Sequence, residues 1–277
     1  MPIKNILSAF ADEASKVLDE QIAVLKKHDM DKIEIRNLDG KNIADLTLEE
    51  AEAAAKKLAD NGIKVSSMGS PIGKVSINSP VEDEIVRLKD MIAKAKIFGT
   101  DKIRMFSFHD TDETPECEAE VIKRLKMFVE VAQAEGIQLC HENEKGIFGD
   151  ITSRCLTIAK EVPGIKLILD PANFIQCGVK PYEAWEVLKD YIIYLHIKDA
   201  GEDKVVVPAG EGVGHVKEIL AAYLAQTEDA LISIEPHLNN FFGFSELEGD
   251  DKTVIANRYA SRFEAFDAAV AATKAIY

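Results

Sequence analysis

The sequence predicts a closed (β/α)8 barrel, and three observations carry this prediction. Eight short apolar runs alternate with longer segments whose apolar residues recur at helical spacing. Four consecutive runs within residues 137–237 end in Glu142, Asp170, His196 and Glu235, spaced 28, 26 and 39 positions apart, which suits repeated strand-loop-helix-loop units. The chain of 277 residues also fits the roughly 250 residues of eight such units. Because no Pro/Ser-rich linker or composition shift interrupts residues 1–277, we expect a single parallel-stranded domain.

The eight expected strands are the short apolar runs. They cover residues 4–10, 32–36, 63–68, 101–106, 137–142, 165–170, 192–196 and 231–235. The second run carries charges where a buried strand should have none. Side chains alternate between the two faces of a strand, so Ile33 and Ile35 are expected to face the helices. Glu34 and Arg36 are then expected to point inward at the barrel mouth.

The segments between the strands carry helix signals. Thr47 and Glu50 match a capping box, and Gly99 and Gly136 are stop signals. The expected helices cover residues 15–28, 47–61, 80–98, 116–135, 150–162, 182–189, 215–226 and a long closing helix 252–276. Trp185 is expected to pack the sixth helix on the barrel, and Phe241, Phe242 and Phe244 to pack under the closing loop rather than stack on the ring of a bound ligand.

Composition limits the possible partners and the cellular location. The 33 Lys and Arg against 48 Asp and Glu leave a net charge of −15, which repels a phosphate backbone, so we expect no nucleic-acid partner. No run approaches the roughly 18 apolar residues of a membrane span, and the first residues lack a signal-peptide pattern. A cytoplasmic location is therefore expected. The four cysteines form no Cys-x-x-Cys pair, which predicts reduced free thiols, although Cys177 in a loop could be reactive.

The four strand-end residues predict a metal site. A barrel places the C-terminal ends of its strands around one mouth, so Glu142, Asp170, His196 and Glu235 should converge. Taken singly, a carboxylate at a strand end is often a helix cap and a histidine is often a core residue. Three carboxylates at one mouth, however, repel one another and lose hydration unless a cation compensates. This fairly hard donor set favours Mn²⁺ or Mg²⁺, with Co²⁺ or Zn²⁺ possible.

Five motifs resemble those of a known family. They are His141-Glu142-Asn143, Leu169-Asp170-Pro171-Ala172-Asn173, His196-Ile197-Lys198-Asp199, Gly210-Glu211-Gly212 and Ile234-Glu235-Pro236-His237. They are similar to the motifs of the xylose isomerase-like TIM barrels. That superfamily includes sugar phosphate isomerases/epimerases, ketose 3-epimerases, hydroxypyruvate isomerases and inosose dehydratases. The resemblance covers essentially the whole chain.

The resemblance implies roles for the strand-end residues. In ketose 3-epimerases a Glu, an Asp, a His and a Glu hold the metal, and the two Glu exchange a proton with a carbon next to the carbonyl. Those Glu correspond here to Glu142 and Glu235. The chain departs from that pattern at Asn173-Phe174, where the epimerases carry a His, and at Lys198, where they carry an Arg. Both departures affect which substrate the resemblance implies, and neither affects the four metal ligands that it implies.

Further polar residues near the expected mouth are candidate substrate contacts. They are Lys198, Asn143, Lys145, Asn173, Glu34, His109, His237 and Glu211. Lys198 could instead pair with Asp199 or Glu211, and Glu34 with Arg36. His109 and His237 could be merely exposed. Gly210-Glu211-Gly212 precedes a helix N-terminus, where an anion could bind, although Glu211 opposes one.

The leading hypothesis is a metal-dependent isomerase or epimerase of a sugar, sugar phosphate or keto-polyol, acting through a cis-enediolate. If a leaving group lies β to the carbonyl, the same proton abstraction gives a lyase or dehydratase. A non-catalytic metal- or sugar-binding protein is a third possibility. A DNA-repair endonuclease family shares this barrel, but six histidines and an acidic charge disfavour it. The expected partner is a small carbohydrate, with homo-oligomer formation left open.

Overall fold

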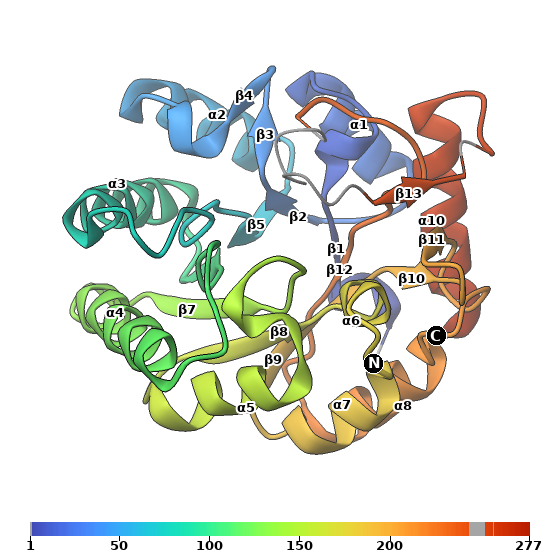
Figure 1. Ribbon diagram of the computed structural model, residues 1–277. Coiled ribbons are helices and arrows are strands. Elements are labelled where there is room, and N and C mark those ends of the chain that lie inside the picture. The colour runs from blue at the N-terminus through green and yellow to red at the C-terminus, as the bar shows by residue number, and fades with distance from the viewer. Residues whose placement is uncertain (1, 244–252, 257) are drawn as a thin grey trace.

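The computed structural model describes residues 2–243, 253–256 and 258–277. Eight parallel strands form one sheet in the order β1-β12-β9-β8-β7-β6-β5-β2, and β1 lies beside β2, so that the sheet nearly closes into a barrel (Figure 1). The strands are β1 Leu7–Ala9, β2 Lys32–Ile35, β5 Lys64–Met68, β6 Lys102–Met105, β7 Gln138–Glu142, β8 Lys166–Leu169, β9 Ile192–Ile197 and β12 Ile232–Ile234. The predicted TIM-barrel fold and all eight predicted strands are confirmed, although the first strand is shorter than predicted, because residues 4 and 5 belong to a 3₁₀ turn.

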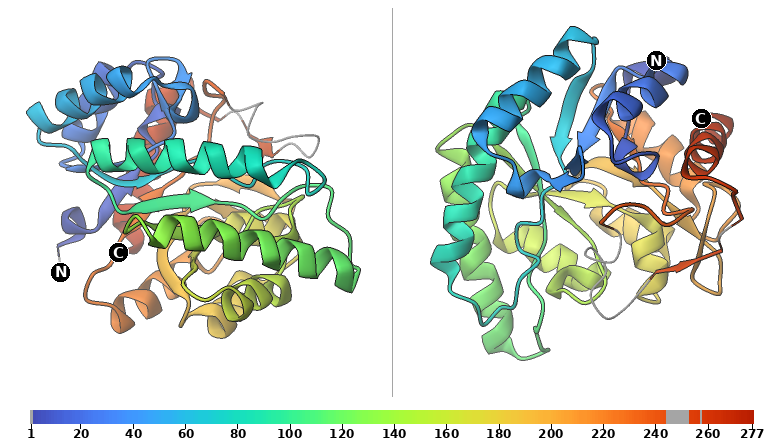
Figure 2. Two further views of the ribbon diagram at one scale, coloured as in Figure 1. Left: turned by 90° about the vertical axis from the view of Figure 1, so that its left-hand side faces the viewer. Right: turned by 90° about the horizontal axis from the view of Figure 1, so that it is seen from above.

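Helices surround the sheet, as the two views of Figure 2 show. They are α1 Leu18–Lys27, α2 Leu48–Asp60, α3 Val81–Phe98, α4 Pro115–Gln133, α5 Thr152–Glu161, α6 Pro171–Gln176, α7 Pro181–Leu188, α8 Val216–Gln226 and α10 Arg262–Ile276. The capping box of α2 forms as predicted, with Thr47 and Glu50 each accepting a backbone N–H of the other residue. No helix among the described residues is long and apolar enough to cross a membrane.

The loops contain short helical turns and short strands. They are the 3₁₀ turns η1 Ile3–Asn5, η2 Ala11–Glu13, η3 Ile43–Asp45 and η4 Phe148–Asp150, the hairpin β3 Asn37–Leu38 with β4 Lys41–Asn42, and a small sheet of β10 Asp199–Ala200, β11 Val205–Val207 and β13 Val254–Ile255. One of these turns bears on the site, because η2 places Asp12 and Glu13 directly after β1.

The closing helix begins later than predicted. Val254 and Ile255 pair with β11 instead of starting a helix, and α10 begins only at Arg262. The physical reason is local: Ser261 accepts the backbone N–H of Glu264, and the Glu264 carboxylate accepts the N–H of Ala260. This Ser-x-x-Glu cap is a stronger start signal than anything near residue 252. The first predicted residue of this helix, Lys252, and Phe244 lie outside the described residues.

The apolar core lies between the barrel and its helices. Strand residues such as Ile33, Leu167 and Ile232 point outward into it, and Trp185 of α7 is fully buried with its ring edge-on to Tyr223 of α8 at 6.3 Å. The barrel interior is more polar than the aliphatic filling usual for this fold. Tyr194 on β9 and Glu34 on β2 are buried there and hydrogen-bond to each other across the barrel at 2.8 Å.

The four cysteines are free thiols, as predicted. Cys140 and Cys155 are buried, and Cys117 and Cys177 are half-buried. Burial raises the pKa of the Cys177 thiol to about 12. Since the thiolate is the reactive form, Cys177 is poorly suited to nucleophilic chemistry at neutral pH.

Candidate metal centre

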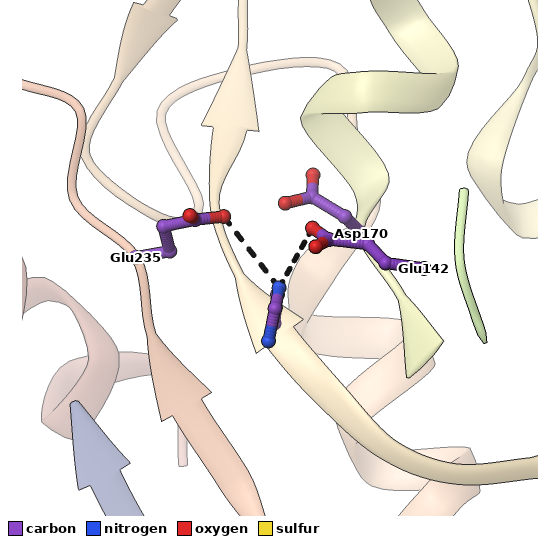
Figure 3. A group of neighbouring side chains, drawn as sticks. Glu142, Asp170 and Glu235 are labelled. Carbon is purple, nitrogen blue, oxygen red and sulfur yellow. Dashed lines mark hydrogen bonds and ion pairs between the residues drawn. The ribbon is translucent and has the colours of Figure 1, made fainter. Parts of the chain in front are cut away.

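The four predicted ligands lie close together at the C-terminal ends of four neighbouring strands. Glu142 ends β7, Asp170 follows β8, His196 lies near the end of β9, and Glu235 follows β12. All four are buried, and one donor atom from each lies within 4.8 Å of the others. Figure 3 shows Glu235 facing Glu142 and Asp170 across this centre. The four side chains therefore meet as expected, while their role as metal ligands stays a prediction.

His196 lies at the middle of the group with its two nitrogens in different surroundings. Nδ1 lies 2.8 Å from Glu142 Oε1 and 3.5 Å from Glu235 Oε2. Nε2 faces away from them, 3.3 Å from Glu34 Oε2. Although burial lowers the pKa of His196, the charges of Glu142 and Glu34 raise it well above its usual value. Nδ1 is therefore the nitrogen that could bind a cation held by the carboxylates.

Asp170 serves two purposes. Its Oδ1 accepts the N–H of Asn173 at 2.9 Å and caps α6, which starts with Pro171 at its first turn. Its Oδ2 faces Lys198 Nζ at 2.9 Å. Sequence reasoning missed α6, although an Asp followed at once by Pro is a common helix start. The cap fixes the carboxylate so that its second oxygen points into the centre.

Three buried cations surround the group. Lys198 Nζ lies 2.9 Å from both Asp170 Oδ2 and Glu235 Oε2, so it pairs with these residues and not with Asp199 or Glu211. Arg36 Nη1 lies 2.9 Å from Glu235 Oε1, and Arg104 Nη1 lies 3.1 Å from Glu142 Oε2. The structure thus confirms the inward direction of Arg36. Sequence reasoning missed Arg104, and its signal was a charge inside the buried strand 101–106.

A second acidic pair adjoins the first group. Asp12 and Glu13 of η2 both bind Arg36, through contacts of 2.9 Å from Nε and 3.2 Å from Nη2. Glu13 also accepts the backbone N–H of His237 at 2.7 Å. Burial raises the pKa of Glu13 to about 8, with Arg36 opposing the rise. Neither residue was singled out from the sequence, because both follow the first strand in a segment with no recognisable motif.

The balance of charge fits a divalent cation. Around this centre the described residues bury the carboxylates of Asp12, Glu13, Glu34, Glu142, Asp170 and Glu235, against the permanent cations Arg36, Arg104 and Lys198. Burial raises the pKa of Asp170 to about 7, even though Lys198 lowers it. The neighbouring carboxylates Glu235 and Glu142 raise the pKa of Asp170 further. Three carboxylates and one imidazole suit Mn²⁺, Mg²⁺, Co²⁺ or Zn²⁺ by donor type.

Two predicted substrate contacts, Asn143 and Asn173, hydrogen-bond within the framework of the site, and their contact with a substrate stays a prediction. Asn143 joins the ends of β7 and β8, since its amide donates to Asp170 O at 2.9 Å and accepts the Asp170 N–H at 2.8 Å. Asn173 donates to Asn143 O at 3.0 Å, and its Nδ2 lies 3.4 Å from Glu142 Oε1. Glu34 lies on the far side of His196 from the carboxylates. Each of these residues is buried.

The remaining candidates lie around the rim. Lys145 Nζ contacts Thr253 Oγ1 at 2.8 Å, and His109 Nδ1 lies 2.9 Å from Gly146 O. His237 is buried, with Nε2 3.5 Å from Glu235 Oε1 and its ring tilted against Phe241. Glu211 is exposed and lies 3.9 Å from Arg258 Nη1, so the structure does not bring it to the centre. Whether any of these residues contacts a substrate stays a prediction.

The glycine-rich loop binds a carboxylate of the protein itself. Asp199 accepts the backbone N–H groups of Ala200, Gly210, Gly212 and Gly214, at 2.9 to 3.1 Å. A Cβ at Gly212 would lie 2.3 Å from Ala200 O, so only glycine fits there. The carboxylate of Asp199 therefore accepts the N–H groups that could have bound an external anion, and it ties the loop to the end of β9, beside His196 and Lys198.

Comparison with known proteins places the chain in a family. Residues 22–251 match the family model described as "Xylose isomerase-like TIM barrel". Because this match spans most of the chain, the protein belongs to the xylose isomerase-like TIM barrel family, as its motifs predicted.

Individual relatives are more distant. The chain is 21% identical to the 3-dehydroshikimate dehydratase of Bacillus anthracis over 206 residues, which are 65% of this chain and 73% of that protein. The crystal structure of the IOLI protein with a bound zinc atom has a TM-score of 0.76 at 18% identity, covering 98% of this chain and 97% of that one. The structure of L-ribulose 3-epimerase has a TM-score of 0.73 at 19% identity, covering 98% and 94%. The two solved structures show the same fold.

Asp199 offers a test of how the loop is held. Asp199→Ala should lower the free energy of unfolding by about 2 kcal/mol or more, because each buried N–H left unpaired costs about 1–3 kcal/mol. Urea unfolding followed by circular dichroism measures the change. Asp203→Ala is the matched control, since Asp203 lies in the same segment but is exposed and, among the described residues, accepts one backbone N–H, that of Val205. Equal losses in the two variants would contradict this account of the loop.

The ligand assignment makes a separate prediction. Asp170→Ala and His196→Ala should each remove stoichiometric divalent metal from the purified protein, because each takes away one of four donors. Elemental analysis after dialysis against Mn²⁺ and removal of free ions measures the occupancy. A folded variant that keeps full occupancy would remove that residue from the ligand set.

Proposed function

We propose that this protein is a divalent-metal-dependent isomerase or epimerase of a sugar, sugar phosphate or keto-polyol, transferring a proton next to a carbonyl through a cis-enediolate. The observation that carries the proposal is the convergence of Glu142, Asp170, His196 and Glu235 at the mouth of the barrel. The sugar epimerases among proteins of similar fold support it. A cytoplasmic location, a carbohydrate substrate and manganese or magnesium as the metal belong to the same proposal.

The chemistry divides between the ion and the two glutamates. A divalent cation bound at this centre would polarise a substrate carbonyl and its neighbouring hydroxyl and so acidify the carbon-bound proton between them. Glu235 lies on one side of the centre, and Glu142 lies on the other (Figure 3). A carboxylate on one face of a substrate can remove the proton, and a carboxylate on the opposite face can return it.

Both glutamates are held in the ionised form that a proton acceptor needs. Each has one oxygen near His196 and the other bound by a guanidinium, Arg104 for Glu142 and Arg36 for Glu235. Burial alone would raise the pKa of Glu142, but His196 and Arg104 lower it overall. The pKa of Glu235 falls well below its usual value, because Lys198 and His237 outweigh burial. Both side chains are therefore ionised at neutral pH, as a proton acceptor must be.

A second candidate function is elimination at the same site. The curated relative with 21% identity is named a 3-dehydroshikimate dehydratase, and this favours a dehydratase or lyase. Proton abstraction would be the shared first step. The outcomes diverge only afterwards, when a leaving group β to the carbonyl departs instead of a proton returning.

Proton NMR in D₂O separates these functions. Mn²⁺-loaded protein is incubated with a panel of keto-sugars, keto-inositols and 3-dehydroshikimate, and products are followed after the metal is removed. An isomerase or epimerase incorporates deuterium at carbon without loss of a fragment, whereas a dehydratase releases water and forms a conjugated product. Metal-loaded protein that does neither across the panel would favour a non-catalytic binding protein.

The same assay tests the two glutamates. Glu142→Gln and Glu235→Gln keep an oxygen donor but remove the base, so turnover should fall by roughly 100-fold or more while metal occupancy stays appreciable. In an epimerase, one variant should still exchange a proton on the face served by its surviving carboxylate. Glu84→Gln is the control, because Glu84 is buried on α3, where it accepts the Gly73 N–H. If only one glutamate proves necessary, a two-base epimerase is excluded and a one-base isomerase or lyase remains.

A further inference from the structure

We propose that Glu34 and Tyr194 are positioning residues for His196: Glu34 sets which ring nitrogen faces the carboxylates, and Tyr194 holds Glu34 in place. The inference rests on the proposed metal-dependent function, because its consequence is how tightly a divalent ion is held. Glu34 comes from β2, the strand at one end of the sheet order, and contributes no donor to the four-residue centre.

The alternation of strand side chains brings these residues together. Tyr194 and His196 are two positions apart on β9, so both point into the barrel, one layer below the other. Glu34 reaches both of them from β2. Its Oε1 accepts the Tyr194 hydroxyl at 2.8 Å, and its Oε2 lies 3.3 Å from His196 Nε2. The carboxylate therefore uses one oxygen for each residue.

Without an ion, both ring nitrogens of His196 face carboxylate oxygens; a divalent ion bound at Nδ1 would take the place of the proton there and leave the proton on Nε2, which faces Glu34. A neutral imidazole has one N–H donor and one nitrogen with a free lone pair. Nδ1 lies among carboxylate oxygens that would share a cation, whereas Nε2 faces Glu34. Placing the proton on Nε2 gives Glu34 a hydrogen bond and leaves the Nδ1 lone pair for the ion. A carboxylate behind a ligating histidine has this effect on tautomer, orientation and basicity.

Packing prevents the ring from turning away. His196 is fully buried, and the ring of Phe10 meets it edge-on with centroids 5.3 Å apart and an interplanar angle of 84°. The Tyr194 ring lies against it at 5.5 Å. Ser67 Oγ on β5 lies 3.1 Å from the Tyr194 hydroxyl, and this hydrogen bond holds the hydroxyl in place. The arrangement thus ties β2, β5 and β9 to the orientation of a single imidazole.

Metal affinity tests the inference directly. Glu34→Gln should weaken the affinity for Zn²⁺ or Mn²⁺ by about 10- to 100-fold, the usual effect of losing a carboxylate behind a ligating histidine. Tyr194→Phe should weaken it by roughly 2- to 10-fold, since the hydrogen bond that holds the Glu34 carboxylate in place is lost while Glu34 itself remains. Competition with a chelating indicator dye measures both. Glu84→Gln again serves as the control, because a general loss of stability from a buried Glu→Gln change would appear there without affecting the ion.

Nitrogen-15 NMR of the Zn²⁺-loaded protein provides a readout that a merely structural role would not change. The wild-type protein should show His196 protonated at Nε2 and metal-bound at Nδ1. Coordination through Nε2, or unchanged affinity in both Glu34→Gln and Tyr194→Phe, would overturn the inference. Should Glu34→Gln fail to fold, Tyr194→Phe and the tautomer decide. If the wild-type protein binds no divalent ion at all, the proposed function itself fails, which is a different result.

Discussion

The site depends on an excess of buried carboxylates over buried cations at the mouth of the barrel. Six carboxylates converge at the mouth, and the described residues oppose them there with three permanent cations. Removing like charges from water without compensation costs several kcal/mol, so such a cluster is stable only with an added positive charge. Protons can supply part of it, as the pKa of about 7 at Asp170, the pKa of about 8 at Glu13 and the raised pKa of His196 indicate. A divalent ion at the four-residue centre would supply it without protonating the groups needed as bases.

Several carboxylates of the site use their two oxygens for different partners, so that the same side chain both holds the structure and faces the centre. Asp170 caps α6 with one oxygen and faces the centre with the other. Glu142 and Glu235 each hold a guanidinium on one oxygen and leave the second near His196. Asp199 binds four backbone N–H groups and so fixes the segment that follows His196 and Lys198. The hydrogen bonds and ion pairs that hold the loops in place therefore also orient the carboxylates of the site.

Much of this could be predicted from the sequence, and the reasons for the rest are physical. Strands and ligands follow from local patterns: apolar runs of regular spacing, each ending in a polar residue. Asp12 and Glu13 could not be found this way, because they join the site through Arg36, 24 and 23 positions away along the chain. The role of Glu34 likewise depends on a partner 162 positions away. The late start of α10 was missed for a different reason, since the cap at Ser261 is local and was readable.

Crystallographic anomalous diffraction from Mn²⁺-loaded protein tests the central claim most directly. The account predicts one strong manganese peak per chain, within bonding distance of Glu142, Asp170, His196 Nδ1 and Glu235. It also predicts that the Glu34 carboxylate lies on the opposite side of the imidazole. The account would be contradicted by a fully occupied peak elsewhere, for example between Glu13, Glu235 and His237, whose donor atoms also lie within 4.8 Å of one another. Absence of any peak at saturating Mn²⁺ would contradict it as well.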